Sequence, residues 1–411
     1  MSARDLLEPD LIKVGTRARN MVWLSFGLLG VVMNAWVPRI PEIKLALHLS
    51  DSQFGVALVG GPLGGLIGAQ LTGRLIHAYG SRWVSMFLAC EITFGIFLLG
   101  MAKNYWGLIV ALFIQGIGTG GLDNGFNTQG VAVESVLRRK YMSSFHGAWS
   151  VGMLLAVSGG GVLARFISPR ENIIGVAAIG LVIFIPTIYF LLPNSLDGHA
   201  GESNGDAVGA KVPLFDRRTA VLWALGIAMV GCLIPEAAIS DWGGILLHRH
   251  MHISTGVDAT GVAAFGFAMI VGRFTGDSLM HRFGAERIVK LGGYIGGATL
   301  GVSIAIAIPL SHLNSIAALI IIVIGFIIAG LGIGPMVPAL ISATGKIPGV
   351  APSVAIARVG IVGILSYFIG PVVTGNLSRI FTLPVAMAFP CGVLILAGYL
   401  SRTLREPGKS Q

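Results

Sequence analysis

The chain has 411 residues, of which 54% are hydrophobic and only 11% carry a charge. About a quarter of the residues of a typical soluble chain are charged, so this composition excludes a large soluble domain. The net charge of +9 would indicate a nucleic-acid partner in a soluble protein, but cytoplasmic loops of membrane proteins also collect Lys and Arg. We therefore predict an integral membrane protein that lies in a lipid bilayer and binds no nucleic acid.

The apolar residues form twelve stretches, each long enough to cross a bilayer as a helix of about 20 residues. We expect spans at residues 20–37, 54–79, 83–101, 106–134, 143–166, 172–192, 219–242, 259–281, 288–308, 315–343, 353–376 and 384–401. Residues 193–217 form a longer polar connection, rich in Gly, Asp and Ser, which we interpret as a cytoplasmic linker. The predicted fold is all-α, with two pseudo-symmetric six-helix halves at residues 1–192 and 218–411.

The distribution of Lys and Arg predicts the orientation in the membrane. Nineteen of these 28 residues fall on the side of the two termini, seven on the opposite side, and Arg273 and Arg358 within spans. Because basic residues collect in cytoplasmic loops, we expect both termini in the cytoplasm. The expected location is the plasma membrane, in this case the inner membrane of a bacterium.

Short glycine-containing patterns recur in the same order in the two halves. Residues 73–80 after the second span correspond to residues 277–284 after the eighth, and residues 116–120 correspond to residues 330–334. A duplicated six-helix unit is the architecture of two-halved transporters.

The loop between spans 2 and 3 carries a known signature. Residues 73–82 read GRLIHAYGSR, which resembles the Gly-x-Leu-x-Asp-Arg-x-Gly-Arg-Lys/Arg motif of the major facilitator superfamily, with His77 and Ala78 in place of the acid and the first basic residue. The resemblance implies secondary active transport by alternating access. It also implies gating roles for side chains of this loop and of its second-half copy: Arg74, Arg82, Asp277, His281 and Arg282.

Further segments resemble one part of that superfamily. Residues 120–127, GGLDNGFN, are similar to a motif of the fucose-permease branch, and residues 144–152 are similar to the YbjJ-like bacterial proteins near it. The resemblance implies a sugar-like solute and proton coupling at Asp123. The branch also has an acid in span 1, where this chain has Asn34 and Trp36 instead.

Span 4 carries a polar stripe, with Asp123 and Asn127 one helical turn apart. We interpret Asp123 as a proton-coupling carboxylate, because burial favours the protonated form and hydration the charged form. The alternative is a carboxylate that hydrogen-bonds to a neighbouring helix. Glu134, nearer the cytoplasmic end, is expected to act as a gate or to reach the membrane surface.

The second half carries its own charged residues within spans. Glu236 is the second candidate for proton coupling. Arg273 has three alternative roles: binding an anionic or polyol substrate, pairing with Asp277, or neutralising Glu236.

The candidate substrate-binding residues are polar or aromatic side chains in or near spans, where tryptophan rings would stack on a sugar. They are Asn34, Trp36, Asn127, His146, Trp149, Trp242 and Arg273. The alternative for the tryptophans is an interfacial belt. The histidine-rich run at residues 248–252 lacks a usual metal-ligand set, so we expect no metal there, and Glu91 has no assigned role.

No enzyme motif, P-loop or cofactor site is present in the sequence, and we expect no enzymatic activity. We predict a monomeric secondary transporter for a small polar, sugar-like solute, coupled to protons. The first alternative is a drug–proton antiporter, although residues 159–161 are Gly-Gly-Gly where such antiporters have Gly-Pro. The second is a membrane sensor that does not transport.

Overall fold

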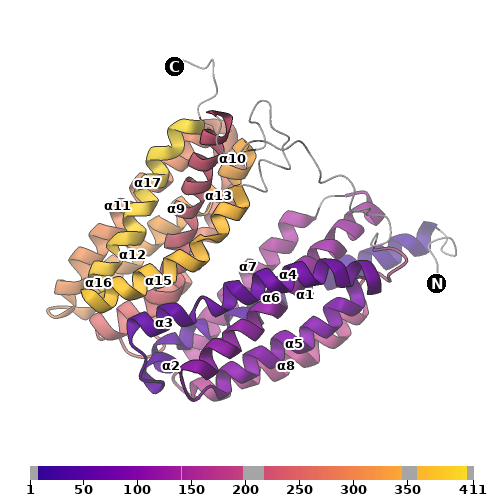
Figure 1. Ribbon diagram of the computed structural model, residues 1–411, viewed down its shortest axis with the longest axis horizontal. Coiled ribbons are helices and arrows are strands. Elements are labelled where there is room, and N and C mark those ends of the chain that lie inside the picture. The colour runs from indigo at the N-terminus through magenta and orange to yellow at the C-terminus, as the bar shows by residue number, and fades with distance from the viewer. Residues whose placement is uncertain (1–7, 140, 198–216, 345–358, 405–411) are drawn as a thin grey trace. The chain divides into compact units, whose positions relative to one another are not determined.

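The computed structural model describes residues 8–139, 141–197, 217–344 and 359–404 (Figure 1). Most of the expected linker and Arg358 therefore lie outside the described residues. The first helices are α1 (Glu8–Asn34), η2 (Val37–Arg39), α2 (Ile40–Ala46), α3 (Asp51–Ala57), α4 (Gly60–Tyr79), α5 (Ser81–Met101), α6 (Tyr105–Leu137), α7 (Met142–Leu163) and α8 (Pro169–Tyr189). The later ones are α9 (Arg217–Ile245), η3 (Leu246–His250), α10 (Ala259–Phe283), α11 (Ala285–Ser311), α12 (Ser315–Ile333), α13 (Met336–Thr344), α15 (Ser366–Ile380), α16 (Leu383–Ala386), α17 (Ala388–Leu400) and η4 (Ser401–Leu404).

Twelve helical stretches of the described chain are long and apolar enough to cross a membrane, which confirms the predicted all-α, twelve-span fold. The helices extend beyond the apolar stretches, since α1 already begins at Glu8. A helix satisfies its own backbone hydrogen bonds, so it continues through polar residues where hydropathy ends. The second expected span is divided at residues 58–59 into α3 and α4.

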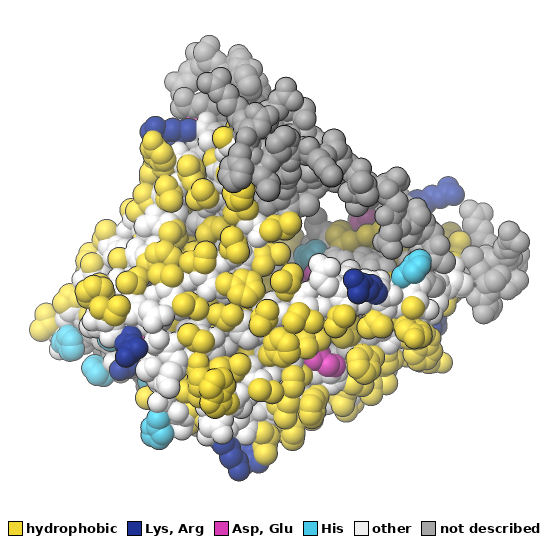
Figure 2. All heavy atoms as spheres, viewed as in Figure 1, with side chains coloured by type: hydrophobic (Ala, Val, Ile, Leu, Met, Phe, Trp, Pro, Cys, Tyr) yellow, Lys and Arg dark blue, Asp and Glu magenta, His cyan; other side chains and the backbone are white. Residues whose placement is uncertain are grey.

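The exterior is apolar where a soluble protein would be charged. Figure 2 shows hydrophobic side chains over most of the visible face, with few charged side chains among them. Large aromatic side chains are exposed, such as Phe87 at 66% and Phe166 at 76%. Exposure of this kind is suited to contact with lipid acyl chains and not with water.

The chain folds into two compact units. The first comprises Met1–His48 and Ala57–Gly205, and the second comprises Leu49–Val56 and Asp206–Gln411. In the first unit α6 packs on both α4 and α5, and α1 packs on α7. In the second unit α12 packs on α10 and α11, while α9 packs on α15 and α17.

Glycines allow α4 and α6 to approach backbone to backbone. A Cβ atom on Gly64 or Gly68 would clash with the carbonyl oxygens of residues 113 and 117 in α6. In the same way, a Cβ atom on Gly116 or Gly120 would clash with carbonyl oxygens in α4. Small residues four apart on both helices are the usual means of close packing in membranes. The crossing holds α6 firmly against α4.

An aromatic core fills the first unit behind α6. The rings of Phe26 and Phe145 stack with their centroids 6.0 Å apart, and Phe126 lies 5.9 Å from Phe26. Phe126 also faces Phe184 of α8 at 6.3 Å. All four side chains are fully buried. Large aromatic side chains at one centre fix the spacing of α1, α6, α7 and α8.

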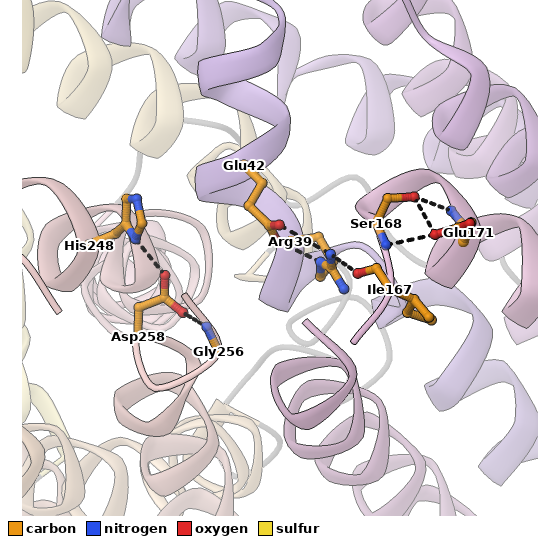
Figure 3. A network of polar contacts seen from close by, with 8 residues as sticks. All are labelled: Arg39, Glu42, Ile167, Ser168, Glu171, His248, Gly256 and Asp258. Atoms are coloured by element: carbon orange, nitrogen blue, oxygen red, sulfur yellow. Dashed lines mark hydrogen bonds and ion pairs between the residues drawn. The ribbon is translucent and has the colours of Figure 1, made fainter. Parts of the chain in front are cut away.

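Each unit also has polar contacts at helix ends (Figure 3). In the first unit the fully buried Arg39 donates to both carboxylate oxygens of Glu42, at 2.6 and 3.1 Å, and to the carbonyl of Ile167. In the second unit His248 Nδ1 lies 3.0 Å from Asp258 Oδ2. Of these contacts, the hydrogen bond from Arg39 to Ile167 joins segments that are 128 residues apart in sequence, whereas the other two are local.

Candidate functional site

Asp123 lies near the middle of the 33-residue helix α6. Its side chain is exposed, and Asn127 one turn later donates its Nδ2 to the backbone carbonyl of Asp123 at 2.7 Å. The carboxylate interacts electrostatically with His146 of α7 and hydrogen-bonds with the Asn127 side chain. Within the described residues, no Lys or Arg forms an ion pair with Asp123.

His146 completes this group. Its Nε2 lies 3.2 Å from Asn127 Oδ1, and its ring packs 5.1 Å from the ring of Phe26. The α1–α7 packing positions the imidazole next to α6. The structure thus brings together three of the expected residues, Asp123, Asn127 and His146. We call them the acid–amide–imidazole group.

The other expected residues of the first unit lie near the C-terminal end of α1 or on α7. Asn34 is half-buried at the last position of α1, where its Nδ2 donates to the Gly30 carbonyl at 2.9 Å. The backbone of Trp149 in α7 approaches Gly30 so closely that a Cβ there would clash. Trp149 is half-buried, whereas Trp36 is only 6% exposed. Trp36 therefore packs as a core residue in this structure.

In the second unit, Glu236 of α9 pairs with Arg273 of α10. Arg273 Nη2 donates to Glu236 Oε1 at 3.1 Å, with side-chain exposures of 35% and 25%. The other carboxylate oxygen, Oε2, is buried without a hydrogen-bond partner. Of the three alternatives for Arg273, the structure thus shows the contact with Glu236. The Asp277 side chain lies outside the described residues.

Trp242 lies in α9, and residues of the same helix line an apolar pocket. Trp242 is 1% exposed and packs edge-on against Phe54 of α3, with ring centroids 5.3 Å apart, so it is a core residue in this structure. A pocket of about 180 Å³ lies between α9, α13 and residues 359–367, and its lining atoms are apolar. Tyr367 lines this pocket and interacts electrostatically with Glu236 and Arg273.

The expected gating residues have different surroundings. Arg74, His281 and Arg282 are exposed. The guanidinium of Arg82 lies over the rings of Tyr189 and Trp83, at 4.6 and 5.4 Å from the centroids.

Glu134 has a structural contact that the sequence did not predict. Its Oε1 accepts the backbone N–H groups of Tyr141 and Met142, at 2.6 and 3.0 Å. These N–H groups belong to the start of α7, which carries positive partial charge. Glu134 therefore caps α7 from the end of α6.

Two polar networks were missed by sequence reasoning. In the second unit, Asp51 accepts hydrogen bonds from Arg249, at 3.0 Å, and from Ser378. In the first unit, the buried Gln129 donates to Ser81 Oγ at 2.8 Å, and Ser81 in turn donates to Asp197. The partners are 48 to 327 residues apart in sequence, and no local spacing could have indicated them.

The histidine-rich run contributes structural contacts. Besides the contact of His248 with Asp258, His252 lies 6.1 Å from the His312 ring. Among the described residues, no three His, Cys, Asp or Glu side chains are grouped so that they could hold a metal ion.

The sequence matches a known protein family. Residues 22–349 match the profile of the Major Facilitator Superfamily. An uncharacterised MFS-type transporter of Yersinia pestis is 29% identical over 393 residues, which cover 95% of this chain and 96% of the relative. The membrane protein MosC of Rhizobium meliloti is 26% identical over 386 residues, covering 92% of this chain and 88% of MosC.

Solved structures share the fold at low identity. The nucleoside transporter NupG has a TM-score of 0.74 at 12% identity and covers 95% of this chain and 98% of its own. A bacterial homologue of the human lysosomal transporter Spinster has a TM-score of 0.72 at 16% identity, over 94% of this chain and 96% of its own. The family match covers most of the sequence, and the chain belongs to the major facilitator superfamily of secondary transporters, which are not enzymes.

Proposed function

We propose that the protein transports a small polar, sugar-like solute together with protons, and that Asp123 is the proton-coupling residue. The observation that carries the proposal is the position of Asp123: an exposed carboxylate in the middle of a membrane-spanning helix, beside an amide and an imidazole. A carboxylate at such a depth needs a compensating cation or a proton. In the described part of the chain it has no Lys or Arg partner.

The neighbours of Asp123 are suited to a solute with hydroxyl groups. Asn127 and His146 each offer a donor and an acceptor, and both are at least partly exposed. Asn34 adds a second amide, and the half-buried Trp149 adds an aromatic surface for a sugar ring. Substrate class and coupling ion are therefore inferred from the same few side chains.

Glu236 and Arg273 are proposed as the corresponding polar site of the second unit. Their ion pair is partly exposed, and Arg273 has donors beyond the one that Glu236 accepts. A polyol or an anionic group would compete with Glu236 for this guanidinium. Release of Glu236 would then allow its second oxygen to take up a proton. Glu236 is the second proton-coupling candidate on this basis.

The membrane orientation and family branch are part of the proposal. The excess of basic residues on the side of the termini supports cytoplasmic termini in a bacterial plasma membrane. The GGLDNGFN segment supports the fucose-permease branch, and residues 144–152 support the YbjJ-like proteins near it. We propose that the protein acts as a monomer, with Arg74, Arg82, Asp277, His281 and Arg282 near its cytoplasmic gate.

One observation favours drug–proton antiport as a second candidate. The apolar pocket of the second unit lies beside Tyr367, which interacts with Glu236. An apolar pocket near a carboxylate is suited to a lipophilic cation.

The test is flux in proteoliposomes with an imposed proton gradient. The panel contains sugars, polyols, nucleosides and lipophilic amines. We expect at least one polar solute to accumulate with the gradient, and a protonophore to abolish the accumulation. Gradient-dependent movement of amines alone would favour the antiporter. No flux of any compound, from protein that is folded in the liposomes, would contradict both transport proposals and favour the non-transporting sensor.

A further inference from the structure

Two arginines of the first unit lie on adjacent aromatic rings at the end of α8. The guanidinium carbon of Arg17 in α1 lies 5.0 Å from the Phe190 ring centroid, and that of Arg82 in α5 lies 4.6 Å from the Tyr189 ring centroid. The two rings are 5.3 Å apart and nearly perpendicular. Arg17, Arg82, Tyr189 and Phe190 thus form one continuous group. We call it the rim cluster.

The rim cluster has an excess of hydrogen-bond donors. In the part of the chain that the structure describes, neither Arg17 nor Arg82 contacts a carboxylate, and Arg82 Nε is buried without an acceptor. By contrast, Arg39, Arg249 and Arg273 each pair with an acid. A guanidinium has five N–H donors in a fixed plane, and an aromatic face beneath it satisfies none of them in full. The cluster therefore lacks an anionic partner.

The surroundings indicate where this partner lies. The cluster lies in the third turn of α1, at the beginning of α5 and at the end of α8. Exposed aromatic rings accompany it, namely Tyr79 at 64%, Trp83 at 54% and Tyr189 at 53%. Exposed Tyr and Trp side chains mark the level of the lipid headgroups.

Apolar side chains continue from the cluster along α8. Val182 is 70% exposed and Ile185 is 46% exposed, on the turns that precede Tyr189. A molecule bound at the cluster can therefore place an anion on the arginines and hydrocarbon along α8. A free phosphate ion could contact the arginines but has no hydrocarbon to lie along α8. A phospholipid has both a phosphate and acyl chains.

We propose that the rim cluster binds the headgroup of an anionic phospholipid. Planar guanidinium groups donate paired hydrogen bonds to phosphate oxygens. The rings of Tyr189 and Phe190 hold the two guanidinium groups in place, which lowers the entropy that binding costs. Because there are two arginines, a lipid with two phosphates, such as cardiolipin, binds more tightly than phosphatidylglycerol. The site does not depend on which solute the protein carries.

The experiment measures lipid binding to the purified full-length protein by native mass spectrometry and by thermal stability in detergent. The probes are cardiolipin, phosphatidylglycerol, phosphatidylcholine and inorganic phosphate. The test variant is Arg17→Gln combined with Arg82→Gln. The matched control is Arg402→Gln, because Arg402 lies 4.5 Å over the Tyr399 ring at an exposed helix end of the second unit.

We expect the two anionic lipids to bind and stabilise the wild-type and Arg402→Gln proteins, and cardiolipin to do so at lower concentration. The double variant should bind cardiolipin about tenfold more weakly or worse, since charged hydrogen bonds are lost. Equal cardiolipin affinity in the double variant would overturn the proposal, and so would equal stabilisation by phosphatidylcholine or by inorganic phosphate. If the double variant does not fold, Arg17→Gln alone is measured, because Arg17 is exposed. Unchanged cardiolipin affinity in that single variant would also overturn the proposal.

Discussion

The two intramembrane acids, Asp123 in the first unit and Glu236 in the second, are held in different ways. Asp123 is exposed beside an amide and an imidazole, whereas Glu236 is ion-paired with Arg273 at 3.1 Å. Asp123 can gain or lose a proton without breaking an ion pair. A proton can reach the Glu236 oxygen that contacts Arg273 only if this ion pair opens. On this difference rests our proposal that Asp123 is the first candidate for proton coupling and that Glu236, the second candidate, responds to solute binding at Arg273.

The helices that carry the two acids also differ in their packing. The Asp123 helix, α6, contacts α4 backbone to backbone through glycines on both helices. The Glu236 helix, α9, meets α15 at Gly370 through side-chain atoms, since the nearest atoms to a Cβ there belong to Ile234, from 3.4 Å, although α9 also approaches the α17 backbone at Gly231. Side-chain contacts adjust more readily than backbone contacts. We therefore expect the α4–α6 contact beside Asp123 to be rigid and the α9–α15 contact near Glu236 to be adaptable.

The largest effect is expected from Asp123→Asn. The amide has nearly the same shape but cannot exchange a proton, so solute accumulation driven by a proton gradient should fall to the level of empty liposomes. Uptake in proteoliposomes measures this. Asp10→Asn is the matched control, because Asp10 lies at the exposed beginning of α1. Gradient-driven accumulation by Asp123→Asn at the wild-type rate would assign the proton elsewhere.

The difference between the α4–α6 contact and the α9–α15 contact predicts the next largest effect. Gly64→Leu forces a side chain against the α6 backbone, which should cost about 3 kcal/mol or more of unfolding free energy or prevent folding. Gly370→Leu should cost less than about 1.5 kcal/mol, because the Ile234 side chain can move. Thermal unfolding in detergent compares the two variants. Similar losses from both would mean that the two interfaces do not differ in rigidity.

A smaller effect is expected from the Glu236–Arg273 pair. Removing either partner leaves the other charge without compensation, but both side chains are partly exposed. We therefore expect Glu236→Gln and Arg273→Gln each to cost about 1 kcal/mol of unfolding free energy, and the double variant less than their sum. Asp123→Asn, which breaks no ion pair among the described residues, should have the same unfolding temperature as the wild-type protein. Strictly additive losses for Glu236 and Arg273 would show that the ion pair contributes nothing.

Hydropathy was sufficient to predict the fold, because a membrane span is a property of about 20 consecutive residues. The helical spacing of Asp123 and Asn127 likewise indicated one face of one helix. The sequence could not select between the three roles of Arg273, because the choice depends on how α9 and α10 pack. It also gave no indication that Glu134 caps α7, since the partner atoms are backbone N–H groups. The burial of Trp242 by Phe54, 188 positions away in sequence, is a tertiary property of the same kind.

The most direct test of the account compares two assays of one solute in Asp123→Asn proteoliposomes. The solute is one that the wild-type protein accumulates with the proton gradient. Counterflow exchanges labelled for unlabelled solute and needs no net proton movement, whereas accumulation against a concentration difference does. We predict that Asp123→Asn retains counterflow and loses proton-driven accumulation. Retention of both activities would contradict the assignment of Asp123 as the proton-coupling residue.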